Sequence, residues 1–125
     1  MASFARTGRK IVAIGRNYAK HAKELGNAVP EKPFFFLKPT SSYVFNGGNV
    51  EIPQGVLVHH EVELGVIIGK TGRDIVAANA EEHIAGYGEL SLEGDLLLTG
   101  TPEGVGAIQA GDKITAGLQL PDASK

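Results

Sequence analysis

The alternation of apolar and polar positions is strongest at residues 61–68, where it predicts a β-strand. Side chains of a strand point alternately to its two faces. The even-numbered positions here are all apolar, and Glu61 and Glu63 lie on the other face. We therefore expect a strand that is anchored in the core by one face and presents two carboxylates on the other.

Shorter apolar runs, separated by many glycines, predict the remaining elements. We expect strands at residues 11–14, 50–52 and 84–87, and an extended aromatic run at 33–37 that continues through Lys38 because the residue before a proline avoids helix. Two similar segments, 93–100 and 110–117, each predict a Gly-Asp turn that opens a strand. A turn is expected at 46–49. Helices are predicted at 17–25, with Asn17 as N-cap and Gly26 as the stop, and at 77–83. The fold class is α+β and β-rich.

The length of 125 residues suits a single domain. We expect a basic N-terminal tail at residues 1–9, one domain at 10–120 and a short tail at 121–125. The first 23 residues hold six basic side chains and no acid, as in a transit peptide, although a strand-like run already begins at Ile11. The expected location is mitochondrial or cytoplasmic.

Charge and composition exclude several classes of function. The net charge of -2 provides no global attraction for nucleic acid or an anionic membrane. Cysteine is absent, which excludes disulfides and thiolate metal sites. No apolar run approaches the roughly 20 residues of a membrane span. We therefore expect neither a nucleic-acid partner nor a membrane partner.

Glu61 and Glu63 are the first candidates for chemistry. Residues i and i+2 of a strand have Cα atoms about 6.5–7 Å apart, and two carboxylates there repel unless a cation, a proton or water intervenes. Hard divalent cations such as Mg²⁺ or Mn²⁺ prefer oxygen ligands. The alternative is a solvated strand face. For the adjacent His59 and His60, hydrogen bonding at a strand end is favoured over metal ligation.

Three further features could contact a substrate. His21 and Glu24 are neighbours on the predicted helix, an arrangement suited to a general base. Spacing alone instead favours an exposed Lys20–Glu24 pair. The glycine-rich segment 99–106 could present backbone N–H groups to an anion, or form a tight β-turn. Arg16 and Lys38 could each meet a carboxylate, although lone basic residues are usually exposed.

Taken together and in this order, these segments resemble the signatures of the fumarylacetoacetate hydrolase family, in its small single-domain branch. The segments that carry the resemblance are 14–21 (IGRNYAKH), 36–41 (FLKPTS), 59–65 (HHEVELG), 94–95 (GD) and 99–106 (TGTPEGVG). The resemblance implies a mixed β-sandwich roll, usually a homodimer, that binds magnesium or manganese and acts on acylpyruvates or oxaloacetate.

The resemblance also implies roles for individual residues. Glu61 and Glu63 match metal ligands, His21 and Glu24 match a dyad that activates water, and Thr101 matches a loop that meets the substrate carboxylate. Arg16 and Lys38 are the further substrate-binding candidates. The implied reaction is hydrolysis of the carbon–carbon bond of acylpyruvates, or decarboxylation or tautomerisation of oxaloacetate, through a metal-held enolate of a small 2-oxo acid.

One departure from the family pattern affects these expectations. Several dozen family residues are absent near 88–90, so the expected roll is incomplete. No aspartate matches the third metal ligand, and Glu89 lies close to the junction. The alternative is therefore an impaired or inactive shortened paralogue or isoform. Such a chain would act at most as a dimerisation partner, with itself or with a full-length relative.

Overall fold

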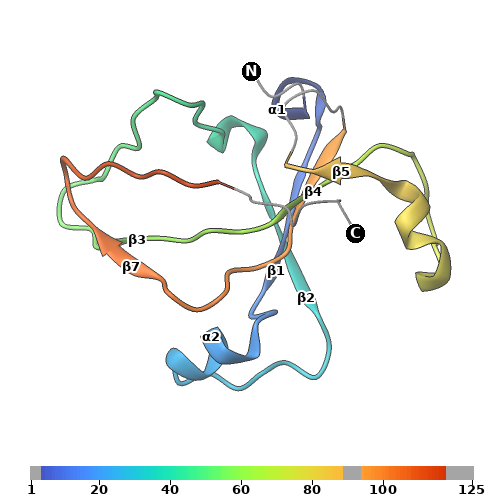
Figure 1. Cartoon of the computed structure of the whole chain (residues 1–125), viewed down its shortest axis with the longest axis horizontal. Helices are drawn as coiled ribbons and strands as arrows, with labels where there is room; N and C mark the ends of the chain where they lie inside the picture. Colours follow the sequence, from blue (N-terminus) through green and yellow to red (C-terminus); the bar gives the residue numbers. More distant parts are fainter. Residues whose placement is uncertain (1–3, 89–93, 118–125) are drawn as a thin grey trace, which may run out of the picture.

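The computed structural model describes residues 4–88 and 94–117, in which short strands outnumber short helices (Figure 1). The strands are β1 (Ile11–Gly15), β2 (Phe34–Lys38), β3 (Val58–His60), β4 (Gly65–Ile68), β5 (Ile84–Tyr87), β6 (Asp95–Leu98) and β7 (Gly106–Ile108). The α-helices are α1 (Phe4–Thr7) and α2 (Ala19–Glu24), and the 3₁₀-helices are η1 (Thr40–Ser42) and η2 (Ala77–His83). None of these helices is long and apolar enough to cross a membrane.

The strands form two separate sheets. Five of them make a mixed sheet in the order β2-β1-β6-β4-β5, and β3 pairs with β7 in an antiparallel ribbon beside it (Figure 1). Only the β1–β6 pair is parallel within the larger sheet. The predicted α+β, β-rich class is confirmed, and the two sheets do not close on each other.

The core lies in the middle of the larger sheet. Ile11 of β1, Leu96 of β6 and Ile67 of β4 form its buried centre, and Ile67 is completely buried. Phe4 and Tyr43 pack against this centre and meet edge to face, with ring centroids 6.0 Å apart. The core is therefore thin, because it depends on three adjacent strands and a few side chains from α1 and the chain after η1.

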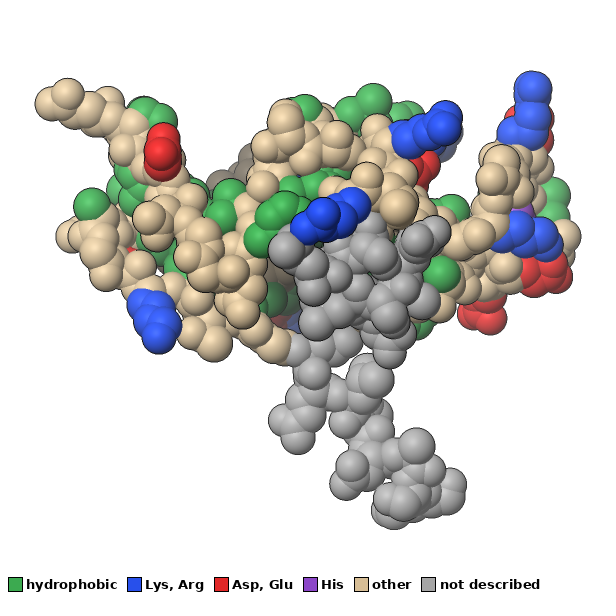
Figure 2. All heavy atoms as spheres, turned by 90° about the horizontal axis from the view of Figure 1, so that it is seen from above, with side chains coloured by type: hydrophobic (Ala, Val, Ile, Leu, Met, Phe, Trp, Pro, Cys, Tyr) green, Lys and Arg blue, Asp and Glu red, His purple; other side chains and the backbone are tan. Residues whose placement is uncertain are grey.

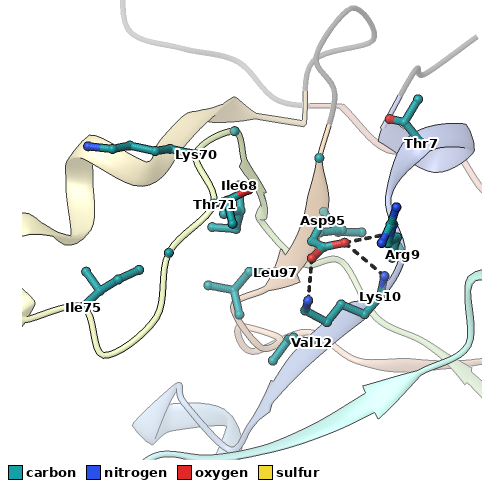
Figure 3. A pocket seen from close by; sticks show the side chains of 14 residues that line it. Thr7, Arg9, Lys10, Val12, Ile68, Lys70, Thr71, Ile75, Asp95 and Leu97 are labelled. Carbon is teal, nitrogen blue, oxygen red and sulfur yellow. Dashed lines mark hydrogen bonds and ion pairs between the residues drawn. The ribbon is translucent and has the colours of Figure 1, made fainter.

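Asp95 fastens the amino ends of β1 and β6 to each other. Its carboxylate accepts hydrogen bonds from the backbone N–H groups of Arg9 and Lys10, at 2.7 and 3.1 Å, and lies 2.8 Å from the Lys10 ammonium (Figure 3). A hollow of about 780 Å³ opens beside this clamp, with Lys70 and Ile75 on its other side (Figure 3). None of the predicted site residues lines this hollow.

Apolar side chains also lie on the surface. β2 is an edge strand whose five residues are all exposed, including three phenylalanines. Figure 2 shows hydrophobic side chains reaching the surface in several places. Among the described residues β2 has one strand neighbour and is apolar on both faces, a combination that is unusual on an isolated domain.

Several predicted elements agree with the structure. The strands predicted at 11–14, 84–87 and after Gly94 are observed, as are the extended aromatic run with Lys38 and the turn at 46–49. The predicted helical turn at 77–83 is a 3₁₀-helix. Gly26 follows the end of α2 with a left-handed φ of 67°, as expected of a helix stop.

Other predicted elements were wrong. The strand predicted at 61–68 is observed only from Gly65. Residues 65–68 pair with β5 and β6, whereas residues 61–64 have no partner in either strand. The predicted alternation also fails, since the neighbours Val66 and Ile67 are both buried in a strand with a partner on each side. Residues 50–52 and 112–117 form no strand, and the missed strand β7 pairs with β3.

The predicted N-cap of α2 was also wrong. Tyr18 occupies the cap position and makes no side-chain cap bond. The Asn17 side chain instead donates to the carbonyl of Thr99, at 2.8 Å, and is therefore used for a tertiary contact.

Candidate metal and substrate site

Most of the predicted site residues lie on segments that meet at one edge of the larger sheet, whereas Lys38 pairs with Ile11 at the opposite end of β1. β1 and β6 are parallel, so the turn after β1 and the loop after β6 emerge at the same edge. β4 runs antiparallel to β6 and begins there. Both the backbone N–H and the hydroxyl of Thr99 donate to the carbonyl of Leu64, at 3.2 and 3.1 Å. This topology brings segments that are far apart in sequence to one place.

Glu63 is the best-anchored carboxylate at this edge. Its Oε2 accepts a hydrogen bond of 2.7 Å from the backbone N–H of Gly100. Partial burial raises the pKa of the Glu63 carboxyl above its ordinary value. The Gly100 hydrogen bond lowers that pKa, the charge of Glu61 raises it, and the charge of Lys38 lowers it. Burial is the largest of these causes, so Glu63 holds its proton more tightly than a free glutamate does.

Glu61 and Lys38 are the charged residues that act on the Glu63 carboxyl. Glu61 is exposed and lies in the segment between β3 and β4, while Lys38 ends β2 and is also exposed. Both charges act on the Glu63 carboxyl, with opposite sign. The two glutamates thus interact electrostatically although they do not lie on a regular strand, and Lys38 acts on Glu63 from the other end of β1.

These carboxylates fit part of the oxygen shell of a hard divalent cation. Glu63 uses one oxygen for Gly100, and repulsion between Glu61 and Glu63 would be relieved by a cation. Within residues 4–88 and 94–117, however, no three histidine, aspartate or glutamate side chains converge as a metal site would require. The position of Glu89, considered as a third ligand, lies outside the described residues. The fit to Mg²⁺ or Mn²⁺ is therefore partial.

Thr101 lies directly after the residue that binds Glu63. Its side chain is only 8% exposed, and its hydroxyl oxygen has no hydrogen-bond partner among the described residues. A buried hydroxyl without a partner is costly, and a bound ligand with a polar group would relieve that cost. This geometry suits the predicted contact with a substrate carboxylate.

His21 and Glu24 form a close pair on α2. His21 is 7% exposed, and its Nδ1 lies 3.7 Å from a Glu24 carboxylate oxygen without a hydrogen bond. The prediction of an exposed Lys20–Glu24 ion pair, which spacing favoured, was wrong, since the Lys20 ammonium binds the Glu103 carboxylate at 3.1 Å. That bond joins α2 to the glycine-rich loop, because Glu103 lies within it.

Arg16 makes the sharp turn between β1 and α2. Its φ of 53° lies in the left-handed region, which a residue with a side chain rarely adopts. The side chain is exposed at the sheet edge that carries Glu63. Its contact with a substrate carboxylate remains a prediction.

Two features of this edge were missed by the sequence reasoning. The Gly100 N–H is the donor to Glu63, and Asn17 binds Thr99 across 82 residues of sequence. The glycine-rich segment was a signal for backbone donors, but nothing in the sequence pairs it with Glu63 or Asn17. His60 bonds the carbonyl of Gly106 at 2.8 Å, so the prediction of hydrogen bonding at a strand end is confirmed for His60.

Comparison with known proteins supports the relationship suggested by these residues. A family model described as the C-terminal part of fumarylacetoacetate (FAA) hydrolase matches residues 10–92, well over half of the chain. The chain belongs to the fumarylacetoacetate hydrolase family. The resemblance found from the motifs is therefore confirmed, and solved members of the family share the fold.

Two curated relatives of this family member carry the names of oxaloacetate enzymes. The mitochondrial oxaloacetate decarboxylase of Dictyostelium discoideum is 62% identical over 89 residues, covering 70% of this chain and 41% of that protein. A mitochondrial oxaloacetate tautomerase of Arabidopsis thaliana is 36% identical over 193 positions, covering 89% of this chain and 86% of that protein. The family member thus spans about two-fifths of the length of the first relative.

The Arabidopsis alignment contains a large internal gap. It runs over 193 positions, whereas this family member has 125 residues, so at least 68 aligned positions have no residue here. Internal positions of the relative are therefore absent from this chain. Their predicted place near 88–90 is a proposal, consistent with a family match that ends at residue 92.

Solved structures show the same fold. Fumarylpyruvate hydrolase from Pseudomonas aeruginosa, solved with Mn²⁺ and pyruvate, has a TM-score of 0.68 and 26% identity, covering 83% of this family member and 82% of that chain. A yeast protein of the fumarylacetoacetate hydrolase family has a TM-score of 0.62 and 24% identity, covering 87% and 86% of the two chains. The incomplete roll expected from the sequence is consistent with these neighbours.

Proposed function

We propose that this chain binds a small 2-oxo acid at the edge around Glu63 and catalyses a divalent-metal-dependent reaction on it. One observation carries the proposal: the Glu63 carboxylate, on which the charge of Glu61 acts, is held by the N–H of Gly100, and the next residue, Thr101, has a buried hydroxyl without a partner among the described residues. Anionic ligands for a cation and a hydroxyl for a substrate are thus carried by segments that the Gly100–Glu63 hydrogen bond joins. The Mn²⁺ and pyruvate of the solved Pseudomonas relative are consistent with this assignment.

Each residue has a distinct part in the proposed reaction. Glu61 and Glu63 would hold Mg²⁺ or Mn²⁺ together with water or other groups, and the cation when bound would supply Lewis acidity beside the 2-oxo group. Thr101 would donate to the substrate carboxylate. Arg16 and Lys38 would add positive charge for a dianionic substrate such as oxaloacetate.

His21 would transfer the proton that the reaction takes from the substrate or from water. Its Nδ1 lies 3.7 Å from Glu24, so that carboxylate would orient the imidazole ring and leave Nε2 to take a proton from substrate or water. Tautomerisation needs a proton to leave the enol oxygen and another to reach the neighbouring carbon. Hydrolysis of an acylpyruvate needs a proton to leave water. One dyad serves either reaction.

Oxaloacetate is the substrate that we favour. The relatives at 62% and 36% identity are named for its decarboxylation and tautomerisation, whereas the solved hydrolase is 26% identical. Their names also place them in the mitochondrion, and the basic start of this chain agrees with the same location. We propose a mitochondrial rather than a cytoplasmic protein.

A second candidate function rests on the incomplete ligand set. The described residues offer two convergent carboxylates, and at least 68 aligned positions of the Arabidopsis relative are absent. A chain without a complete metal site would be an impaired paralogue or isoform. It would act through its exposed β2 edge as a partner in a homodimer or with a full-length relative.

An oxaloacetate assay separates the two candidates. The purified chain is mixed with enol oxaloacetate, and the loss of enol absorbance and the release of carbon dioxide are followed with Mn²⁺ or with excess chelator. We expect Mn²⁺-dependent turnover that falls about 10²–10⁴-fold in His21→Ala and is lost in Glu63→Gln. Glu51→Gln, at an exposed position, is the control. Turnover unaffected by chelator, or unchanged in Glu63→Gln, would refute the first candidate.

A further inference from the structure

The peptide unit between Thr99 and Gly100 is bound at both of its polar groups. Its carbonyl oxygen accepts a hydrogen bond of 2.8 Å from Asn17 Nδ2. Its N–H, on Gly100, donates to Glu63 Oε2 at 2.7 Å. A single peptide group therefore links an amide side chain that follows β1 with a carboxylate that precedes β4.

This linkage transmits orientation because a peptide unit is a rigid plane. The C=O and N–H of a trans peptide point in opposite directions, so a donor that fixes the carbonyl also fixes the direction of the N–H. A hydrogen bond to a carboxylate is shorter and stronger than one between neutral groups. The direction of the Gly100 N–H therefore determines the position of the Glu63 carboxylate. Rotation of this peptide would withdraw the donor from Glu63.

The backbone around the peptide leaves little room for another arrangement. Gly100 has a φ of 95°, which favours glycine, and a Cβ there would lie 3.0 Å from the carbonyl oxygen of Ile14 and 3.1 Å from Asn17 Cβ. Arg16, directly before Asn17, adopts a left-handed φ of 53°. Such backbone outliers cluster at functional sites, where the surrounding structure maintains them. The two turns thus pack closely, with Asn17 between them.

We infer that Asn17 is a positioning residue that orients the Glu63 carboxylate through the Thr99–Gly100 peptide. The inference rests on the proposed function, in which Glu63 binds the cation, but the linkage itself is a property of the chain alone. Asn17 is exposed, and its side chain bonds the carbonyl of Thr99, so its loss should alter the orientation of Glu63 more than it alters folding. Groups behind a metal ligand typically change metal affinity by about 10–100-fold when removed.

The first test needs no metal. The backbone amide of Gly100 is followed by two-dimensional NMR in the full chain, since a hydrogen bond to a carboxylate moves an amide proton downfield. We expect Glu63→Gln and Asn17→Ala each to move this resonance upfield, and Asn79→Ala, an exposed asparagine on η2, to leave it in place. Asn17→Asp keeps the shape and loses the donor, and it serves if Asn17→Ala does not fold. A Gly100 resonance unchanged in the Asn17 variant overturns the inference.

The second test measures Mn²⁺ affinity by the loss of the free-ion signal in electron paramagnetic resonance. We expect Asn17→Ala to weaken binding about 10-fold, and the Asn17→Ala/Glu63→Gln double variant to bind no more weakly than Glu63→Gln alone. If the losses of Mn²⁺ affinity in the two single variants add up in the double variant, Asn17 does not act through Glu63 and the inference is overturned. If the unaltered chain retains no Mn²⁺, the proposed function fails, and the Gly100 resonance alone decides the inference.

Discussion

At the scale of single residues, Asp95 and Glu63 show opposite electrostatic environments at the two ends of the larger sheet. Burial alone would raise the pKa of the Asp95 carboxyl, but the Lys10 side-chain bond, the backbone N–H groups of Arg9 and Lys10, and the Lys10 charge lower it below 3.8. The pKa of the Glu63 carboxyl is raised, chiefly by burial. The charge of Asp95 is therefore stabilised by donors of the chain itself. The charge of Glu63 is less well stabilised by the chain, and a bound cation would stabilise it.

Replacing Asp95 with alanine should weaken the junction of β1 and β6. We expect Asp95→Ala to lower the free energy of unfolding by about 1–3 kcal/mol at pH 7, since three donors lose a charged acceptor. Because the folded pKa of Asp95 is depressed, its contribution is complete above 3.8 and is lost as pH falls through the folded pKa. Urea unfolding at pH 7, pH 5 and pH 3 measures the effect.

The exposed Glu51 supplies the control for this experiment. Glu51→Ala should change the free energy of unfolding by no more than about 0.5 kcal/mol at each pH, as surface substitutions usually do. The difference between the Asp95 variant and the unaltered chain should shrink at pH 3. A difference that stays constant from pH 7 to pH 3 would show that the Asp95 charge does not stabilise the fold.

At the scale of elements, local patterns predicted several short elements but contained no information on which strands pair. The strand at 11–14 and the helix stop at Gly26 depend on neighbouring residues, and both were predicted. The segment 61–64 has a strand-like pattern but lacks ladder partners, and β7 was missed because its partner β3 lies far away in sequence. Pairing depends on contacts that periodicity does not contain.

The edge strand β2 is the element most suited to contact between chains. Phe35 is 70% exposed, and it shares a strand face with the exposed Leu37. We expect Phe35→Asp to reduce concentration-dependent association of the chain, because a charge on an apolar edge opposes pairing. Its effect on the free energy of unfolding should be small, since the side chain is already exposed. Sedimentation velocity over a range of concentrations measures the association.

Leu57→Asp is the matched control, since Leu57 is 73% exposed but does not lie on β2. If association depends on β2, the Leu57 variant should sediment like the unaltered chain. Equal loss of association in both variants would indicate nonspecific attraction among apolar side chains. No change in the Phe35 variant would exclude the β2 edge as the contact surface.

At the scale of the whole molecule, the sequence predicted the class of fold and most of the candidate site residues, but not their assembly. Glu61, Glu63 and Lys38 were predicted individually, and in the structure the charges of Glu61 and Lys38 both act on the Glu63 carboxyl. The ties that assemble this edge, from Asn17 to Thr99 and from Gly100 to Glu63, span 82 and 37 residues. They depend on β1 and β6 being parallel, which residue spacing does not specify.

The thin core sets the stability of the whole chain. Among the described residues, six apolar side chains are buried, two of them alanines, and Ile67 is the one large side chain that is completely buried. We expect Ile67→Ala to lower the free energy of unfolding by about 2–5 kcal/mol, the usual range for truncating a buried isoleucine. A domain commonly has a total stability of about 5–15 kcal/mol, so this single change should remove a large part of the free energy of unfolding.

Thermal melts followed by circular dichroism test this expectation, with Ile114→Ala as the control at a half-exposed isoleucine. The control should melt like the unaltered chain, and the Ile67 variant should show a much lower or absent transition. Since a ligand that binds only the folded state stabilises it by about 2.7 kcal/mol at a hundredfold excess over Kd, Mn²⁺ should restore part of that transition if the Glu63 edge binds it. A cooperative melt of the Ile67 variant near that of the unaltered chain would mean that the larger sheet does not depend on this core.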